Sequence, residues 1–177
     1  QLATVEVSLV NSMSREQVMR QYVCMVKKQY DYVIIDCRPS LGLTVINALT
    51  ASDSIIIPVQ AHILAAGDMA TLFKTVGRVK KQLNPNLKID GIVMTMVDNR
   101  TNLGRNTVKA VRDTYGNLVR VFNTEIPFAV RAAEVPEKAQ SIYAYDPNGK
   151  VAQAYESLTK EVLEIGARQK TKDYDAR

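Results

Sequence analysis

The sequence contains few of the residues that build metal, disulfide or nucleophilic sites. It has one histidine and two cysteines among 177 residues. Cys24 and Cys37 show no CxxC spacing and have no histidine pair near them, so we predict two buried thiols of a reducing compartment rather than a disulfide or a metal centre. His62 has neither a nucleophile motif nor a paired acid to complete a triad, and we predict a surface or packing role for it.

Long apolar runs are also absent. No stretch is long enough to cross a bilayer, and the start lacks the pattern of a secretory signal peptide, so a cytoplasmic location is the default prediction. The length of 177 residues and the apolar content of 46% predict one domain over residues 1–166, followed by a polar, flexible tail over residues 167–177. Because Gln1 rather than Met begins the sequence, we interpret it as a fragment or a processed product.

The excess of positive charge is modest. The sequence carries 23 Lys and Arg against 18 Asp and Glu, a formal net charge of +5. An excess of this size permits contact with nucleic acid but does not demonstrate it. The positions of the basic residues therefore matter more than their sum.

One short apolar run organises the chain. Tyr32–Ile35 ends at Asp36 and is followed by the turn residues Pro39, Ser40 and Gly42. Such a run is typical of a strand buried on both faces of a parallel sheet, and ligands bind at the carboxyl ends of such strands. A carboxylate in this place suits Mg²⁺ beside a phosphate. The alternative is that Asp36 only caps the next helix, and the residues alone leave both interpretations open.

Strands and helices alternate along the rest of the chain. The apolar patterns predict strands over Tyr32–Asp36, Ser54–Val59, Lys88–Val97 and Val119–Ile126. They predict helices over residues 14–29, 43–50 and 69–83, a helix ending at Tyr115, and helices over residues 130–139 and 151–165. This alternation implies an α/β fold with a mostly parallel sheet flanked by helices on both faces. The strand ends would share one edge, where we place the function: Asp36, Gln60, Asp98 and Pro127.

Local signals add two details at the helix ends. We expect Ser14 and Gln17 to cap the first helix, which packs on the sheet. Asp98 is expected either to orient Arg100 or to cap the following helix, for which Asn99 and Thr101 are equal candidates.

Several blocks of sequence resemble one known family. YDYVIIDCRPSLGLTVINALTASDSIIIPVQ is similar to the Walker B and switch II region of the ParA/Soj family of partition ATPases, whose text is close to DCPPSLG, NALTA and PVQ. The likeness continues through NPNLKIDGIVMTMVDNRTNLG, EIPFAVRAAEVP, YDPNGK and AYESLTKEV, from Leu2 to about Val162. The resemblance implies a P-loop NTPase-like, three-layer fold, truncated at its N-terminus. It also implies an ATPase that forms a homodimer around ATP and Mg²⁺, binds double-stranded DNA nonspecifically, and is stimulated by a ParB-like partner at the bacterial nucleoid.

The resemblance also implies roles for single residues. Asp36 takes the Walker B role on Mg²⁺ and is the catalytic candidate, Pro39 lies in the switch segment, and Pro127 lies against the adenine. We place Met96 near the base from its position at a strand end. Four basic residues are the candidates for DNA binding, two matched to the family's arginines and two on the helix between them: Arg100, Arg131, Lys109 and Arg112.

The basic residues have a second interpretation. By themselves the basic residues favour a solvated helix face for Lys109 and Arg112, and the family likeness reverses that preference toward phosphate contacts. Contacts of that kind would read the DNA backbone with little sequence preference.

The sequence also departs from the family pattern. Arg38 stands where the family mostly has proline, and Phe128 replaces a basic residue, which puts the strength of DNA binding in doubt. No GxxxxGK[ST] segment occurs between Gln1 and Arg177, so we expect this polypeptide not to hydrolyse ATP by itself and to bind it poorly. Two alternatives remain: a MinD-like positioning ATPase, for which residues 166–177 are too polar, and a non-catalytic DNA- or protein-binding module.

Overall fold

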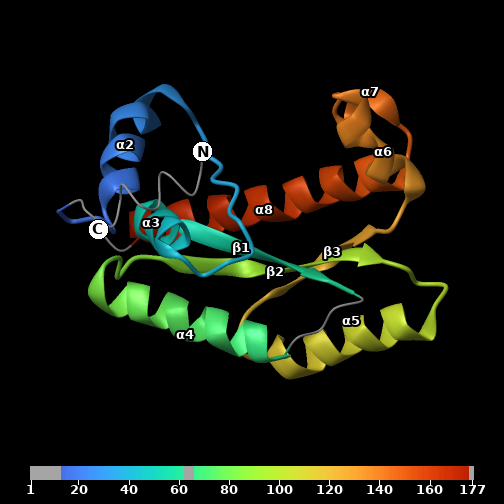
Figure 1. Cartoon of the computed structure of the whole chain (residues 1–177), viewed down its shortest axis with the longest axis horizontal. Coiled ribbons are helices and arrows are strands. Elements are labelled where there is room, and N and C mark those ends of the chain that lie inside the picture. Colours follow the sequence, from blue (N-terminus) through green and yellow to red (C-terminus); the bar gives the residue numbers. More distant parts are fainter. Residues whose placement is uncertain (1–12, 62–65, 176–177) are drawn as a thin grey trace. The chain divides into compact units, whose positions relative to one another are not determined.

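The computed structural model describes residues 13–61 and 66–175. His62, the first residues of the family likeness and the last two residues lie outside the described part. Helices and strands alternate along the chain (Figure 1): α2 (Val18–Val26), η1 (Lys27–Gln29), α3 (Leu43–Ala51), β1 (Ser54–Gln60), α4 (Ala66–Gln82), β2 (Lys88–Val97), α5 (Asn102–Tyr115), β3 (Val121–Pro127), α6 (Val130–Lys138), α7 (Ile142–Tyr145) and α8 (Lys150–Asp175).

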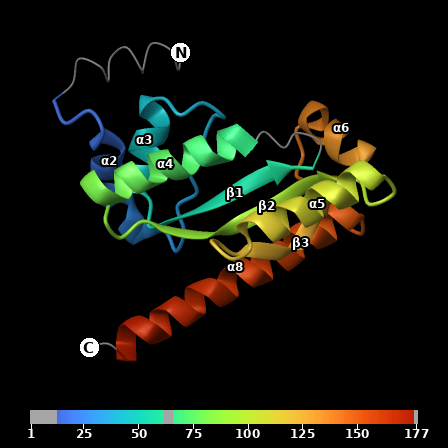
Figure 2. The same cartoon turned by 90° about the horizontal axis from the view of Figure 1, so that it is seen from below.

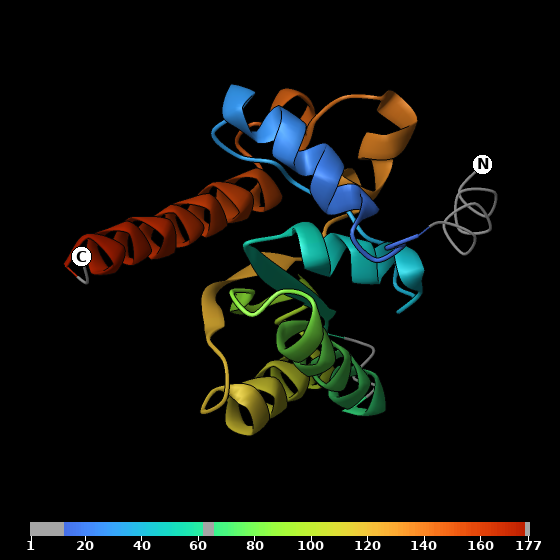
Figure 3. The same ribbon diagram turned by 90° about the vertical axis from the view of Figure 1, so that its left-hand side faces the viewer.

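The chain divides into two compact units. The first contains residues 1–55 and 65–88, and the second contains residues 56–64 and 89–177. In the first unit α2 lies against α3, as Figure 3 shows for the blue and cyan helices. The buried Asn47 joins them, because its amide donates to the Arg15 carbonyl at 2.7 Å and its oxygen accepts from the Met19 amide at 3.1 Å.

The sheet has the strand order β1-β2-β3. β2 and β3 pair in parallel, with Ile92 opposite Val121 and Val97 opposite Pro127. β1 runs the same way, because the Lys88 amide donates to the Asp53 carbonyl at one end and the Ala61 amide donates to the Thr95 carbonyl at the other. The predicted mostly parallel sheet is therefore confirmed.

In the second unit the sheet lies between two helices. Figures 1 and 2 show α5 on one face of β2 and β3 and α8 on the other. The core on the α8 side consists of Val93, Phe122, Ile126, Val151 and Ile165. β2 and β3 approach closely at Gly91, where an added Cβ would lie 2.9 Å from the Phe122 ring, so only glycine fits there without a shift. Burial of this apolar set provides the main stabilisation of the unit.

The predicted strand over Tyr32–Asp36 is wrong. Residues 31–42 form no strand, and Ile34 is 92% exposed. A strand depends on ladder hydrogen bonds to a neighbour, and within residues 13–61 and 66–175 this segment has no such neighbour. Apolar composition alone did not decide the structure here. The other predicted strands are confirmed as β1, β2 and β3.

The helices differ from prediction mainly at their ends. α8 continues to Asp175 rather than Ile165, while a flexible tail over residues 167–177 stays a prediction. The Ser14–Gln17 cap is wrong, because Ser14 has a φ of 53° and the Gln17 side chain makes no capping hydrogen bond. α7 was not predicted. Its start is set by Ser141, whose hydroxyl accepts from the Ala144 amide. None of the helices in the described part has the length and hydropathy needed to span a membrane.

Candidate functional site

The loops after β2 and β3 leave the sheet side by side. β2 ends at Val97 and β3 at Pro127, and the Phe128 amide donates to the Val97 carbonyl at 3.0 Å. Because the strands are parallel, both loops start at the carboxyl edge, where ligands bind in open α/β sheets. Gln60, Asp98 and Pro127 follow or end strands at this edge, as predicted. Asp36 does not, because its segment is not a strand.

An open pocket of about 380 Å³ lies at this edge. Its volume falls within the range of small-molecule sites, roughly 300–1,000 Å³. Its walls come from the ends of β2 and β3 and from the first turns of α8: Val97, Asn99, Thr124, Glu125, Pro127, Lys150, Gln153, Ala154 and Ser157. The lining combines apolar side chains, uncharged polar groups, one acidic and one basic side chain, a mixture that suits a polar ring such as a nucleobase.

Met96 does not belong to the pocket lining. The Met96 side chain is 44% exposed, and its backbone has a φ of 52°, a conformation that residues other than glycine rarely adopt. The pairing of β2 with β3 shifts between Met94 and Val97, so Met96 lies in a bulge that turns its side chain out of the regular alternation. The prediction that Met96 faces a base stays a prediction.

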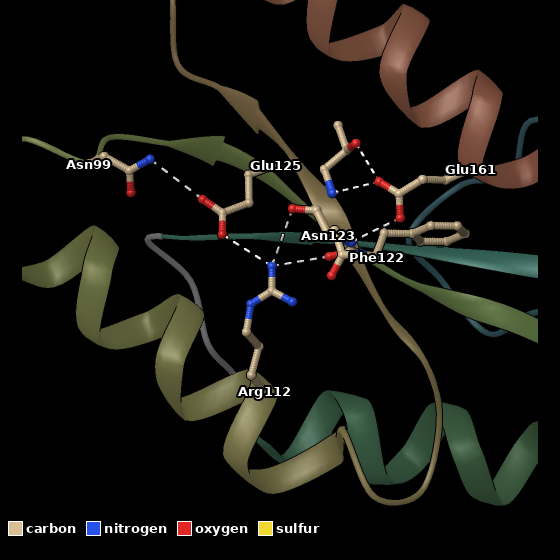
Figure 4. A network of polar contacts seen from close by, with 7 residues as sticks. Asn99, Arg112, Phe122, Asn123, Glu125 and Glu161 are labelled. Atoms are coloured by element: carbon tan, nitrogen blue, oxygen red, sulfur yellow. Dashed lines mark hydrogen bonds and ion pairs between the residues drawn. The ribbon is translucent and has the colours of Figure 1, made fainter.

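Glu125 forms one wall of the pocket and is held by α5. Figure 4 shows the Arg112 guanidinium beneath it: Nη2 lies 3.2 Å from Glu125 Oε1 and donates to the Phe122 carbonyl at 3.1 Å. Asn99 Nδ2 lies 3.5 Å from the other Glu125 oxygen. The Arg112 side chain is only 33% exposed, so its charge is directed into the protein.

Glu161 holds the opposite side of β3. Its carboxylate accepts from the Asn123 amide at 3.0 Å, from the Thr124 amide at 2.8 Å and from the Thr124 hydroxyl (Figure 4). Burial alone would raise the pKa of the Glu161 carboxyl, but these hydrogen bonds favour the carboxylate and together hold that pKa below its usual value. Glu161 therefore fastens α8 to the strand that lines the pocket.

Arg100 and Arg131, the two DNA-binding candidates matched to the family's arginines, are exposed and paired with acids. Arg100 is 83% exposed, and its Nε and Nη2 lie 2.8 and 2.9 Å from the two Asp98 carboxylate oxygens. Asp98 thus orients Arg100, and the hydrogen bond and charge of that carboxylate raise the Arg100 pKa. Arg131 is 68% exposed and lies 3.0 Å from Asp146. The cap of α5 is Thr101, whose hydroxyl accepts from the Gly104 amide.

The basic residues of α5 separate into two groups. Lys109 is exposed, whereas Arg112 contacts β3 as described above. Arg105, one helical turn before Lys109, is a basic candidate that the sequence prediction missed. Its guanidinium donates to the Asn99 carbonyl and to the Asn102 side-chain oxygen, both uncharged. The i, i+4 spacing of Arg105 and Lys109 is the sequence signal that could have predicted this pair on one face of α5.

Asp36 and Pro39 lie in the exposed segment of the first unit that precedes α3. The alternative that Asp36 caps α3 is wrong, because Gly42 occupies the N-cap position. Cys24 and Cys37 are exposed, which corrects the prediction of buried thiols. Partial desolvation and the neighbouring Asp36 charge raise the pKa of the Cys37 thiol. Within the described residues no group of three or more His, Cys, Asp or Glu side chains could hold a metal.

Comparisons with known proteins agree with this arrangement. A family profile described as an AAA domain matches residues 1–89. The sporulation initiation inhibitor protein Soj of Bacillus subtilis is 45% identical over 94% of this chain and 65% of its own length. The chromosome partitioning protein ParA of Myxococcus xanthus is 40% identical over 92% of this chain and 56% of its own length. The chain therefore spans about three-fifths of these curated relatives.

Solved structures of similar fold include one synthase, described in two forms. Cobyrinic acid a,c-diamide synthase from Mycobacterium smegmatis has a TM-score of 0.76 at 30% identity, covering 92% of this chain and 58% of its own. Its structure with bound ADP and magnesium has a TM-score of 0.67 at 28% identity, covering 78% and 61%. The parallel sheet and its helices define an α/β protein of the P-loop NTPase-like class. The chain belongs to the family described as an AAA domain, and it is similar to the Soj and ParA chromosome partitioning proteins.

Proposed function

We propose that this chain is the part of a ParA-like partition ATPase that receives the nucleotide base and contacts DNA. The observation that carries the proposal is the pocket between the end of β3 and the start of α8, with Pro127 in its wall. The pocket is large enough for a base and presents carboxylate, amide and hydroxyl groups to its edges. In this proposal the base enters the pocket, and Met96 lies beside it on the adjacent bulge.

The proposed cofactors are ATP and Mg²⁺. Structures of the related synthase contain ADP with magnesium and an ATP analogue with magnesium, which supports ATP and Mg²⁺ here. Magnesium is commonly held by one or two carboxylates together with phosphate oxygens and water, so the single carboxylate of Asp36 is a suitable donor without an acidic cluster. A magnesium ion there would neutralise phosphate charge. Pro39, three residues later, would set the turn of the switch segment.

Hydrolysis is proposed to depend on a phosphate-binding segment. Residues 1–177 contain no GxxxxGK[ST] sequence, whose backbone amides and lysine neutralise the β- and γ-phosphates in this class. We therefore propose that this chain binds nucleotide weakly and does not hydrolyse it by itself. We also propose that the ATPase forms a homodimer, is stimulated by a ParB-like partner, and works on the nucleoid in the cytoplasm.

The proposed DNA contacts are Arg100, Arg131 and Lys109, with Arg105 added. All four are exposed, and they lie on α5, on the loop before it and on α6. Exposed guanidinium and ammonium groups of this kind bind backbone phosphates without reading bases. We assign Arg112 instead to holding Glu125, which lines the pocket, because Glu125 and the Phe122 carbonyl already occupy its guanidinium.

Nucleotide binding tests the proposal with two matched variants on α8. Ser157 and Thr159 are both exposed, and each hydroxyl donates to the carbonyl four residues earlier, but only Ser157 lines the pocket. We expect Ser157→Leu to weaken binding of a fluorescent ADP analogue about tenfold, or about 1.4 kcal/mol, by filling the pocket. Thr159→Leu should leave it unchanged. Equal affinities for the two variants and the unchanged chain would contradict the pocket assignment.

A further inference from the structure

Arg100 and Arg131 each have a carboxylate bound to the guanidinium that a DNA phosphate would contact. Asp98 contacts Arg100 through Nε and Nη2 with both carboxylate oxygens, which is the paired geometry by which arginine also binds a phosphate. The Arg100 backbone amide donates to the same Asp98 at 3.1 Å. Asp98 therefore fixes the direction of Arg100 and cancels its charge.

The second pair depends on a turn that leaves room for its acid. Arg131 Nη1 lies 3.0 Å from Asp146 Oδ1, and Asp146 belongs to a turn closed by the Gly149 amide, which donates to the Asp146 carbonyl at 2.9 Å. A Cβ on Gly149 would overlap the Asp146 carboxylate. The nearby acid Glu134 already accepts from the Tyr145 hydroxyl at 2.7 Å. Glycine at 149 thus allows Asp146 to reach Arg131.

Arg105 provides the contrast within the same surface. Its guanidinium donates to two uncharged oxygens, so no carboxylate cancels its charge among the contacts described. Of the exposed arginines proposed to bind DNA, Arg100 and Arg131 are neutralised and Arg105 keeps its full charge. Both acids are mostly covered, with 20% and 21% of their side chains exposed, whereas the two arginines face solvent.

We propose that Asp98 and Asp146 compete with DNA phosphates for Arg100 and Arg131, and so lower the affinity of this surface for duplex DNA. This inference rests on the proposed DNA-binding function and adds a feature that limits the affinity for DNA. A phosphodiester must displace or share each carboxylate before the arginine can bind it. Exposed ion pairs are weak, so a polyanion exchanges with them readily but binds less tightly than it would to a free arginine.

Neutralising each acid tests the proposal. The chain carrying Asp98→Asn or Asp146→Asn would be titrated with fluorescent duplexes of unrelated sequence, with Mg²⁺ and ATP present, at several salt concentrations. We expect each variant to bind about three- to tenfold more tightly at low salt. We also expect a steeper dependence on salt, by up to about 0.9 in the logarithmic slope for each arginine released.

Asp113→Asn is the control for charge alone. Asp113 is exposed on α5, and its replacement changes the net charge by the same amount without releasing either arginine. Gly149→Ala should act like Asp146→Asn by displacing that carboxylate, while Gly77→Ala, with open space around it, should change nothing. Thermal unfolding of each variant confirms that it folds.

The outcomes separate the two proposals. Tighter binding and a steeper salt slope for Asp98→Asn and Asp146→Asn, beyond those of Asp113→Asn, would support the competition. Binding no tighter than that of Asp113→Asn, in a chain that does bind duplex, would overturn the competition and leave the DNA-binding function standing. Absence of duplex binding by the unchanged chain and by every variant would overturn both.

Discussion

Arg112 is the residue that decides how the wall of the pocket is built. A basic residue three positions after Lys109 indicates a charged helix face, and the sequence prediction grouped the two. The structure directs Arg112 to β3, where it balances the Glu125 charge and satisfies the Phe122 carbonyl. Spacing along a helix fixes the angle between two side chains but not which of them meets a partner from a distant strand.

Removing the Arg112 charge should destabilise the fold. Arg112→Gln leaves Glu125 without its cation, and we expect a loss of about 1–2 kcal/mol in the free energy of unfolding, after allowance for the solvent that reaches this side chain. Lys109→Gln, on the exposed side of the same helix, should stay within about 0.5 kcal/mol of the unchanged chain. Urea denaturation measures both. Equal unfolding midpoints for the two variants would show that Arg112 is a surface residue after all.

At the scale of elements, the parallel α/β order was predictable and the first strand was not. β1 and β2 combine an apolar run with turn residues, while β3 has a polar interior, and the neighbours of all three supply the ladder bonds that the pattern assumes. Tyr32–Ile35 has the same composition, but the described structure gives it no partner strand. Of the pocket, the sequence predicted only its place at the carboxyl edge of the sheet, with Pro127 at that edge. Three residues at or beside the pocket lie on α8, which the sequence predicted only as an amphipathic packing helix: Gln153, Ser157 and Glu161. No sequence motif indicated a functional role for them.

The contact between α8 and β3 should make stability depend on pH. Because the pKa of Glu161 is lower in the folded chain than in the unfolded chain, its contribution is present above the usual glutamate value of about 4.3 and is lost as pH falls through the lower, folded pKa. Unfolding midpoints in urea at pH 7 and at about pH 3 should therefore differ more for the unchanged chain than for Glu161→Gln.

A second glutamate on α8 provides the control for this pH effect. Glu156→Gln removes an exposed carboxyl that pairs with Lys160, and it should leave the pH dependence of the unchanged chain intact. If the Glu161→Gln and Glu156→Gln chains lose stability in parallel as the pH falls, the hydrogen bonds to Asn123 and Thr124 do not hold the strand.

At the scale of the whole molecule, the exposed arginines are the proposed contacts between the chain and duplex DNA. Replacing Arg100 and Arg131 together by Glu should weaken retention of duplex DNA of every sequence and reduce the logarithmic salt slope by about 1–2. The matched control, Arg78→Glu with Lys81→Glu, places the same charge change on the exposed side of α4 in the other unit. Equal retention by the two double variants would assign Arg100 and Arg131 to the solvated surface.

The placement of α8 ties ligand occupancy to folding. Its first turns line the pocket, its middle accepts the β3 amides through Glu161, and Ile165 enters the apolar core. A molecule that occupies the pocket only when this helix is docked must shift the unfolding equilibrium, raising the melting temperature with the logarithm of its concentration. Heat resistance at saturating nucleotide is thus a direct measure of the affinity of the pocket, obtained without any enzymatic turnover.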